Sequence, residues 1–204
     1  MTTLNHSYTQ QAVSVFKKGG IVIFPTDTAF GIGCRIDRPQ SIRKLYQIRR
    51  RPTGKPVPVL VSGADMAVSY YLNPSIVVRR LIKKYWPGAL TIVAPCQTDK
   101  VYYLVCGAGN TIGLRMPNHN QMLDIIEQVG VPILGPSANF HGGQTPYTQN
   151  DLDPELVKLA DYVMPGKTDL KSTSTVVDCS ASPYIVIRSG AIDLPPEVHI
   201  MAET

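Results

Sequence analysis

Residues 21–33 read IVIFPTDTAFGIG, an apolar tetrapeptide that runs directly into a loop of hydroxyl, carboxyl and glycine residues. An uninterrupted apolar run of this length predicts a strand that is buried on both faces. The loop behind it places Thr26, Asp27 and Thr28 at the end of that strand, where a rigid sheet can hold them against a ligand. Hydroxyl groups beside strands are also common structural residues, so the segment predicts a strand and leaves the use of its loop open.

The rest of the chain is also divided into short helices and strands, because 17 prolines and 16 glycines interrupt it. Apolar periodicity predicts helices over residues 8–18, 37–47, 74–84, 121–129 and 153–159. Apolar runs predict strands at residues 21–24, 57–61, 89–94, 111–116, 132–135, 162–164, 174–178 and 184–189. The helices and strands interleave without the regular spacing of a βαβ array or a barrel. This order predicts an α/β protein with an open, twisted, mixed sheet flanked by helices.

Single residues predict how three of these elements begin. Asn73 precedes Pro74 and is expected to cap the helix that follows. Asp153 precedes Pro154 and is expected to begin the last predicted helix in the same way. Pro58 has no N–H to donate, so the strand at 57–61 is expected to lie at a sheet edge or to contain a bulge.

Composition limits the class of protein. The chain has 204 residues, of which 44% are hydrophobic and 17% charged, so we expect a single folded domain over residues 1–204 rather than a disordered chain. No apolar run approaches the ~20 residues of a membrane-spanning helix. The N-terminus lacks a basic start followed by an apolar core, so we expect a cytoplasmic protein without membrane association. The four cysteines have no CxxC spacing and are expected to be reduced and buried: Cys34, Cys96, Cys106 and Cys179.

A cluster of cations gives the strongest chemical signal. It lies between residues 43 and 55, contains no carboxylate, and consists of Arg43, Lys44, Arg49, Arg50, Arg51 and Lys55. Guanidinium groups bind phosphate oxygens in pairs, and the turn PTGKP at 52–56 constrains the end of the cluster. The cluster therefore predicts a phosphate site, with a solvated basic surface as the alternative. The net charge of +5 also suggests an anionic partner.

Two further loops could contribute to a site. Ser137 and Asn139 follow an apolar strand and precede Gly142-Gly143, so a hydroxyl, an amide and backbone N–H groups could face one ligand. The alternative for this segment is an ordinary Asn/Gly turn. Four hydroxyl residues at 172–175 lead into the strand at 174–178 and are equally compatible with a structural role.

Other patterns exclude several kinds of site. The four histidines have no His or Cys at metal-ligand spacing, and the chain lacks both GxxxxGK[ST] and GxSxG. Gly31-Ile32-Gly33 is only half of a dinucleotide fingerprint, and no helix is predicted directly after it. We therefore expect no protein-ligated metal and no covalent nucleophile, so any chemistry should depend on positioning and positive charge.

Together these segments resemble the YrdC-like family of threonylcarbamoyl-adenylate synthases. The resemblance runs in the family's order from Tyr8 to Ile192. It is carried by seven blocks: PTDTAFGIGC, RRRPTGKPVPVLV, WPGALTIV, TIGLRMPNH, GPSANFHGG, STSTVVD and VIRSGAI. The chain ends near residue 204, so we expect it to be the short, single-domain form without the extra C-terminal domain of longer members.

The resemblance implies an enzyme, a nucleotidyltransferase that joins L-threonine, bicarbonate and ATP into threonylcarbamoyl-AMP and releases pyrophosphate. A partner threonylcarbamoyl transferase complex would then pass the threonylcarbamoyl group to the tRNA adenosine next to the anticodon. The family fold implies a deep, positively lined cavity. Mg²⁺ would enter with ATP, bound mainly by phosphates and water.

Site residues follow from the resemblance, motif by motif. Arg51 and Lys55 would be the catalytic cations at the ATP phosphates. The ATP site would consist of Arg49, Arg51, Lys55, Thr111, Ser137, Asn139, Thr145 and Arg188. The L-threonine site would consist of Thr28, Arg115, Gly135 and Ser174.

Four positions depart from the family pattern, and two other functions compete with the synthase. One of the four is Thr173, which stands where the family often has Glu. Arg49 replaces a lysine, Asp27 the common Glu, and Phe30 the common Tyr, so the cations are kept and one hydroxyl is lost. One alternative is a YrdC-like paralogue without synthase activity. The other is a double-stranded RNA or tRNA-binding module, suggested by the net charge and by a basic helix face at residues 79–84, where weak tRNA binding is also possible.

Overall fold

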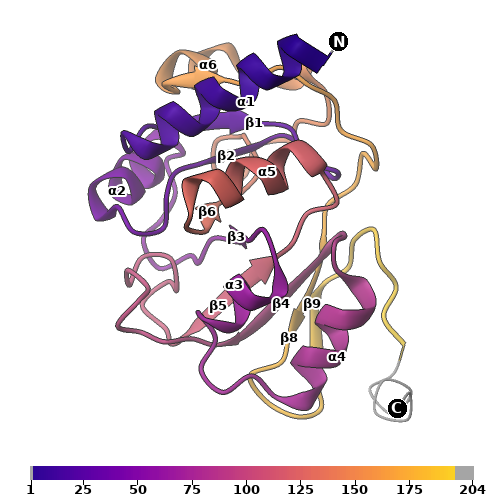
Figure 1. The fold of residues 1–204 in the computed structure, drawn as a ribbon. Coiled ribbons are helices and arrows are strands. Elements are labelled where there is room, and N and C mark those ends of the chain that lie inside the picture. The colour runs from indigo at the N-terminus through magenta and orange to yellow at the C-terminus, as the bar shows by residue number, and fades with distance from the viewer. Residues whose placement is uncertain (1, 196–204) are drawn as a thin grey trace.

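The computed structural model describes residues 2–195, and the side chains of residues 6–195 (Figure 1). Residue 1 and residues 196–204 of the predicted domain lie outside the described part. The helices are α1 (Thr2–Lys17), α2 (Pro39–Ile48), α3 (Ala64–Val68), α4 (Ile76–Tyr85), α5 (Asn120–Val129) and α6 (Pro154–Leu159), with a short 3-10 helix η1 (Gln149–Asp151). The strands are β1 (Val22–Phe24), β2 (Gly31–Gly33), β3 (Val59–Leu60), β4 (Leu90–Pro95), β5 (Thr111–Arg115), β6 (Ile133–Leu134), β7 (Tyr162–Val163), β8 (Thr175–Asp178) and β9 (Ile185–Arg188).

These strands form two mixed sheets. The smaller sheet has the order β2-β1-β7, in which β1 pairs antiparallel with β2 and parallel with β7. The larger sheet has the order β6-β3-β5-β4-β8-β9 and also combines parallel and antiparallel pairs. The predicted α/β class with mixed sheets is confirmed, and its strands lie in two sheets.

A close approach between β2 and β6 joins the two sheets. The Leu134 N–H donates to the Cys34 carbonyl, and the Ile32 N–H donates to the Pro136 carbonyl, both at 2.9 Å. A Cβ on Gly33 would lie 1.7 Å from the Leu134 carbonyl oxygen, so only glycine allows this contact. The contact brings the loop after β1 next to the loop after β6, which are the two segments that the sequence marks as candidate ligand loops.

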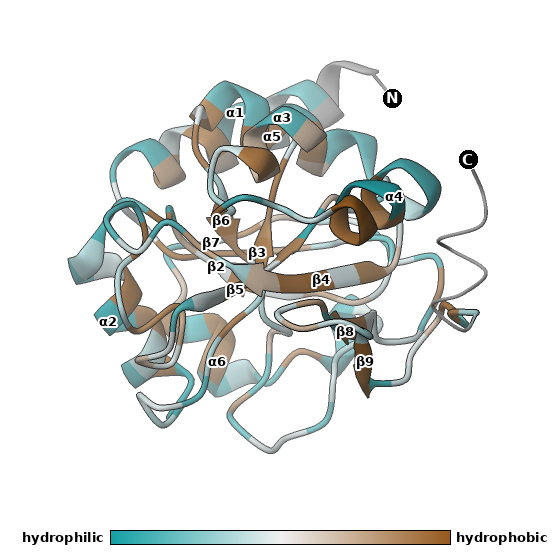
Figure 2. Ribbon diagram, turned by 90° about the horizontal axis from the view of Figure 1, so that it is seen from below, coloured by the Kyte–Doolittle hydropathy of each residue, from teal (hydrophilic) through white to brown (hydrophobic). Residues whose placement is uncertain are grey.

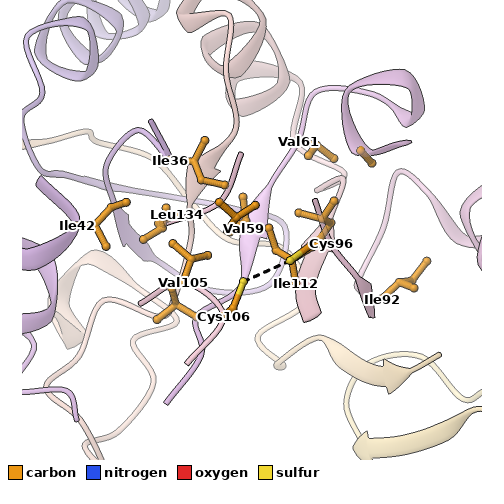
Figure 3. Packing of buried hydrophobic residues seen from close by; sticks show 14 of the residues in the cluster. Ile36, Ile42, Val59, Val61, Ile92, Cys96, Val105, Cys106, Ile112 and Leu134 are labelled. Carbon is orange, nitrogen blue, oxygen red and sulfur yellow. Dashed lines mark hydrogen bonds between the residues drawn. The ribbon is translucent and has the colours of Figure 1, made fainter. Parts of the chain in front are cut away.

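Helices cover the sheets through their apolar faces. α1 and α5 lie together over the smaller sheet, with Phe16 of α1 and Ile125 of α5 in one buried cluster with Phe24 of β1 (Figure 1). α4 packs against β4, and Figure 2 shows its hydrophobic side facing that strand and its hydrophilic side facing outward. The main cluster fills the space around the larger sheet (Figure 3). Within residues 2–195, no helix has the length and apolar content that crossing a bilayer demands.

Two of the local predictions are wrong, and one is confirmed. Asn73 has a left-handed backbone (φ 47°) and does not cap α4; the cap is Ser75, whose Oγ accepts from the Val78 N–H at 3.3 Å. β3 is not an edge strand, since it lies between β6 and β5. Pro58 precedes β3, so its missing N–H removes no ladder bond. Asp153 caps α6 as predicted, accepting from the backbone N–H groups that follow it.

Candidate active site

A cavity opens where the two sheets meet, with a volume of about 540 Å³ that includes the part open to solvent. Its walls come from the loop after β1, from β3 to β5 of the larger sheet, from the loop after β6 and from the segments around β8 and β9. The lining includes these residues of the predicted site: Thr28, Arg115, Gly135, Ser137, Thr145, Ser174 and Arg188. The structure thus gathers most of the predicted threonine and nucleotide residues around one space.

One wall of the cavity is a row of polar side chains across the larger sheet. Arg115 ends β5, Thr91 lies on β4, Ser174 precedes β8 and Arg188 ends β9, so each comes from the next strand in the sheet. The Thr91 and Ser174 hydroxyl oxygens lie 2.9 Å apart. Arg188 Nη2 donates to Ser174 Oγ and to the Ser174 carbonyl, both at 2.8 Å. Arg188 and Thr91 therefore hold the Ser174 hydroxyl between them.

Arg115 is buried beside Asp27 at the end of this row. The two residues are 5% and 3% exposed, and Arg115 Nη2 donates to Asp27 Oδ1. Arg115 also donates to Thr28 Oγ1 at 2.7 Å and to the Gly88 carbonyl at 2.9 Å. Burial lowers the pKa of Arg115, and the carboxylate of Asp27 opposes that shift. A guanidinium has five N–H groups, so two remain on Nη1 and Nη2 for an anionic ligand.

The predicted phosphate cations divide into an inner and an outer group. Arg49 is 3% exposed, and its Nε donates to the Asn139 carbonyl at 3.2 Å. Asn139 Oδ1 accepts from Ser137 Oγ at 2.6 Å, so the Ser-Ala-Asn loop and the cation cluster form one hydrogen-bonded unit. Arg51 Nη1 lies 3.4 Å from His141 Nδ1 on the same side. The outer cations bind other surface groups: Arg43 binds Tyr102, Lys44 binds Asp161, and Arg50 binds Glu155.

The Arg49 guanidinium is a buried cation that the described residues leave without an ion-pair partner. Among residues 6–195, no carboxylate forms an ion pair with Arg49, and its Nη1 has no hydrogen-bond partner. Burial and the neighbouring Arg51 lower the pKa of Arg49 to about 10. A buried cation of this kind lowers stability unless it is paired.

Five predicted residues are absent from the cavity lining: Arg49, Arg51 and Asn139, which belong to the hydrogen-bonded unit described above, and also Lys55 and Thr111. Lys55 is exposed, and its carbonyl rather than its ammonium makes the contacts of this turn, accepting from Arg51 Nε at 3.2 Å. Thr111 begins β5, at the opposite end of that strand from Arg115, and pairs with Pro95. Neither residue lines the cavity in this structure.

Sequence reasoning missed Thr91, which is 2% exposed and lines the cavity. A signal was present, because Thr91 is the one hydroxyl residue within the apolar run ALTIV of residues 89–93. A buried hydroxyl in such a run needs a hydrogen-bond partner, and here the partner is Ser174.

Comparison with known proteins adds a family model and two similar curated sequences. The Sua5_yciO_yrdC model, described as "Telomere recombination", matches residues 14–190. The chain is 30% identical to the threonylcarbamoyl-AMP synthase of Bacillus subtilis over 186 residues, covering 89% of this chain and 53% of that protein. It is 32% identical to a putative threonylcarbamoyl-AMP synthase of Methanocaldococcus jannaschii over 201 residues, covering 94% and 91%. The chain thus spans about half the length of the Bacillus subtilis protein.

Two solved structures share the fold. One is the crystal structure of P. abyssi Sua5 complexed with L-threonine, with a TM-score of 0.86, 25% identity and coverage of 96% of this chain and 57% of that chain. The other is the crystal structure of E. coli YciO, with a TM-score of 0.78, 25% identity and coverage of 93% and 91%.

Proposed function

The chain belongs to the Sua5_yciO_yrdC family, and we propose that it is a threonylcarbamoyl-AMP synthase that uses L-threonine, bicarbonate and ATP. The observation that carries this proposal is that Arg115, Arg188 and the hydroxyls of Thr28 and Ser174 all line one cavity. The similarity to synthases, and to a Sua5 structure complexed with L-threonine, supports the same substrates.

Each substrate would use a different part of the site. The two N–H groups that remain on Arg115 would bind the carboxylate of L-threonine, and the hydroxyls of Thr28 and Ser174 would bind beside it. ATP would lie toward Ser137, Asn139, Thr145 and Arg188, with its phosphates at Arg49 and Arg51. Lys55 would contact the phosphates only if its exposed side chain moved. Thr111 would contact the nucleotide only if the nucleotide extended beyond the cavity.

The reaction needs positive charge rather than a covalent nucleophile. The threonine amine and bicarbonate form a carbamate, whose oxygen attacks the α-phosphorus of ATP and displaces pyrophosphate. Negative charge then builds up on the phosphoryl oxygens, where Arg49 and Arg51 would stabilise it, as nucleotidyltransferases do. One well-placed donor of this kind contributes roughly 3–4 kcal/mol to the transition state.

Mg²⁺ would enter this site with the nucleotide. The cavity lining contains no carboxylate, which fits an ion held by phosphate oxygens and water rather than by the protein. Bound there, the ion would neutralise charge on the triphosphate.

We extend the proposal to a role in the cytoplasm, where a threonylcarbamoyl transferase complex would use the product to modify tRNA.

The proposal is tested by pyrophosphate release from purified protein with Mg²⁺ and ATP. We expect release only when threonine and bicarbonate are both present, and we expect Arg51→Ala to lower the rate by about a hundredfold. Arg79→Ala, on the exposed face of α4, is the matched control and should leave the rate unchanged. Release that does not depend on threonine, or no release at all, would contradict the synthase and favour a paralogue or an RNA-binding role.

A further inference from the structure

Two of the four buried cysteines touch each other. The Sγ atoms of Cys96 and Cys106 lie 3.5 Å apart in the main apolar cluster (Figure 3). Cys96 directly follows β4, and Cys106 lies in the loop of residues 101–110 that leads to β5. A disulfide has an S–S distance of about 2.05 Å, so the two sulfur atoms would have to approach by about 1.5 Å to form one.

The loop that carries Cys106 supports the turn at residues 51–56, which begins with Arg51 of the inner cations. Tyr46 connects the two segments, since its hydroxyl lies 2.5 Å from the Leu104 carbonyl and 2.9 Å from the Lys55 carbonyl. The Val57 N–H donates to the Val105 carbonyl at 3.2 Å. A Cβ on Gly107 (φ 61°) would lie 2.8 Å from the Gly54 carbonyl oxygen. A movement of Cys106 would therefore displace the segments that hold Arg51.

Of the two segments that carry the cysteines, the loop is held less by the sheet than the end of β4, although Leu104 and Val105 are buried in the main cluster. Cys96 is fixed to the neighbouring segments, because its N–H donates to the Asn110 carbonyl at 2.9 Å and it forms a bridge with Tyr71. Cys106 lies between turn hydrogen bonds, followed by two residues with positive φ, Gly107 and Ala108. A segment held by local turns shifts more readily than the end of a strand in the centre of a sheet.

The geometry points to Cys96 and Cys106 as a reversible disulfide site that couples oxidation to the position of the turn at residues 51–56. Hydrogen peroxide would transfer one oxygen atom to the first thiolate, giving a sulfenic acid and hydroxide, and the hydroxide would take up the proton that the thiol had released and become water. The second thiol would then displace that oxygen as a second water and form the S–S bond. Two electrons and two protons pass from the thiols to peroxide, and an added dithiol would reduce the disulfide to two thiols while being oxidised to a disulfide itself.

Burial controls the rate of this oxidation. It raises the pKa of both thiols, and for Cys106 to about 12, with the neighbouring sulfur adding to the shift. The thiolate is the reactive form, so oxidation is slow at neutral pH and becomes faster as the pH rises.

The experiment treats the full chain with hydrogen peroxide, denatures it, alkylates the remaining thiols and digests it with trypsin. Lys100 lies between the two cysteines, so the disulfide would link two separate peptides, residues 85–100 and 101–115. We expect the linked pair, a mass loss of two hydrogens and alkylation of only two cysteines. Cys106→Ala should abolish the link, and Cys34→Ala, which removes another buried thiol, should not.

The second readout is amide hydrogen exchange of residues 49–57, which we expect to change on oxidation, to recover with dithiothreitol, and to stay constant in Cys106→Ala. Alkylation of all four cysteines without a linked peptide would overturn the proposal, as would a link that leaves this exchange unchanged. The expected effect of oxidation on ATP affinity rests on the proposed function, so this affinity is measured in a separate experiment. We expect it to fall by about tenfold on oxidation, which is about the factor that one lost charge-assisted hydrogen bond from Arg51 to a phosphate would cause. A reduced protein that fails to bind ATP would contradict the synthase and leave the disulfide result standing.

Discussion

Thr91→Val tests whether the hydroxyl row on the larger sheet prepares Ser174 for a ligand. Ser174 Oγ accepts from Arg188 Nη2 at 2.8 Å and lies 2.9 Å from Thr91 Oγ1. A hydroxyl oxygen has two lone pairs and one proton. When Thr91 donates the second hydrogen bond, both lone pairs of Ser174 are used and its own proton can point into the cavity. Ser174 then becomes a donor suited to the carboxylate or carbamate of threonine.

Valine keeps the shape of Thr91 and removes the donor. One hydrogen bond of this kind contributes about 1 kcal/mol, so we expect the free energy of unfolding to fall by about that amount. The Ser174 hydroxyl also loses its preferred direction, so we expect the dissociation constant for L-threonine to rise by about fivefold, which corresponds to about 1 kcal/mol. Thr91→Ser restores the hydroxyl and should bind threonine as the wild type does.

Calorimetric titration with L-threonine and urea unfolding together measure the two effects. Thr175→Val is the matched control, because Thr175 is buried on the neighbouring strand and its hydroxyl donates to the Ile192 carbonyl at 2.6 Å, away from the cavity lining. It should lower stability and leave threonine binding intact. Unchanged threonine affinity in Thr91→Val, or an equal loss in Thr175→Val, would refute the proposed role of the row.

Three further predictions concern charged and titratable groups. Arg49→Met removes a buried charge that has no carboxylate partner in the described chain. We therefore expect unchanged or higher stability in urea, together with at least tenfold weaker ATP binding. Lower stability would show that Arg49 is structural. Arg115→Leu leaves Asp27 buried without its partner and should lower the free energy of unfolding by about 3–5 kcal/mol, with Asp27→Asn in the same background recovering a large part; equal stability of both variants would contradict this pairing. His119 caps α5 by accepting from the Met122 N–H, and burial lowers the pKa of its imidazole. The unfolded chain therefore binds more protons than the folded chain below the ordinary histidine pKa of about 6.5, so stability should fall as the pH drops through that range. His119→Asn keeps a cap and should flatten the dependence of stability on pH, measured by thermal unfolding.

The sequence predicted most of the elements and seven of the fifteen residues that line the cavity. The apolar run at 21–24 becomes β1, and Asp153 caps α6, because strand burial and helix capping depend on residues that are close in sequence. The blocks that resemble the YrdC-like family also supplied Thr28, Arg115, Ser137 and the other predicted residues around one cavity. The resemblance identified these residues because the motifs of a family reflect which residues meet in its fold. Composition and spacing alone hold no such information.

Tertiary structure alone decided which residues lie opposite one another. The order of the larger sheet places β3 inside despite Pro58, and it brings Thr91, Ser174 and Arg188 from separate strands into one row. The same packing turns Arg49 inward and leaves Lys55 in solvent, although both belong to one basic stretch of sequence. The physical reason is that hydrogen bonding and charge burial depend on distance in space. The pairing of strands and the contact between β2 and β6 set that distance, and no local pattern encodes it.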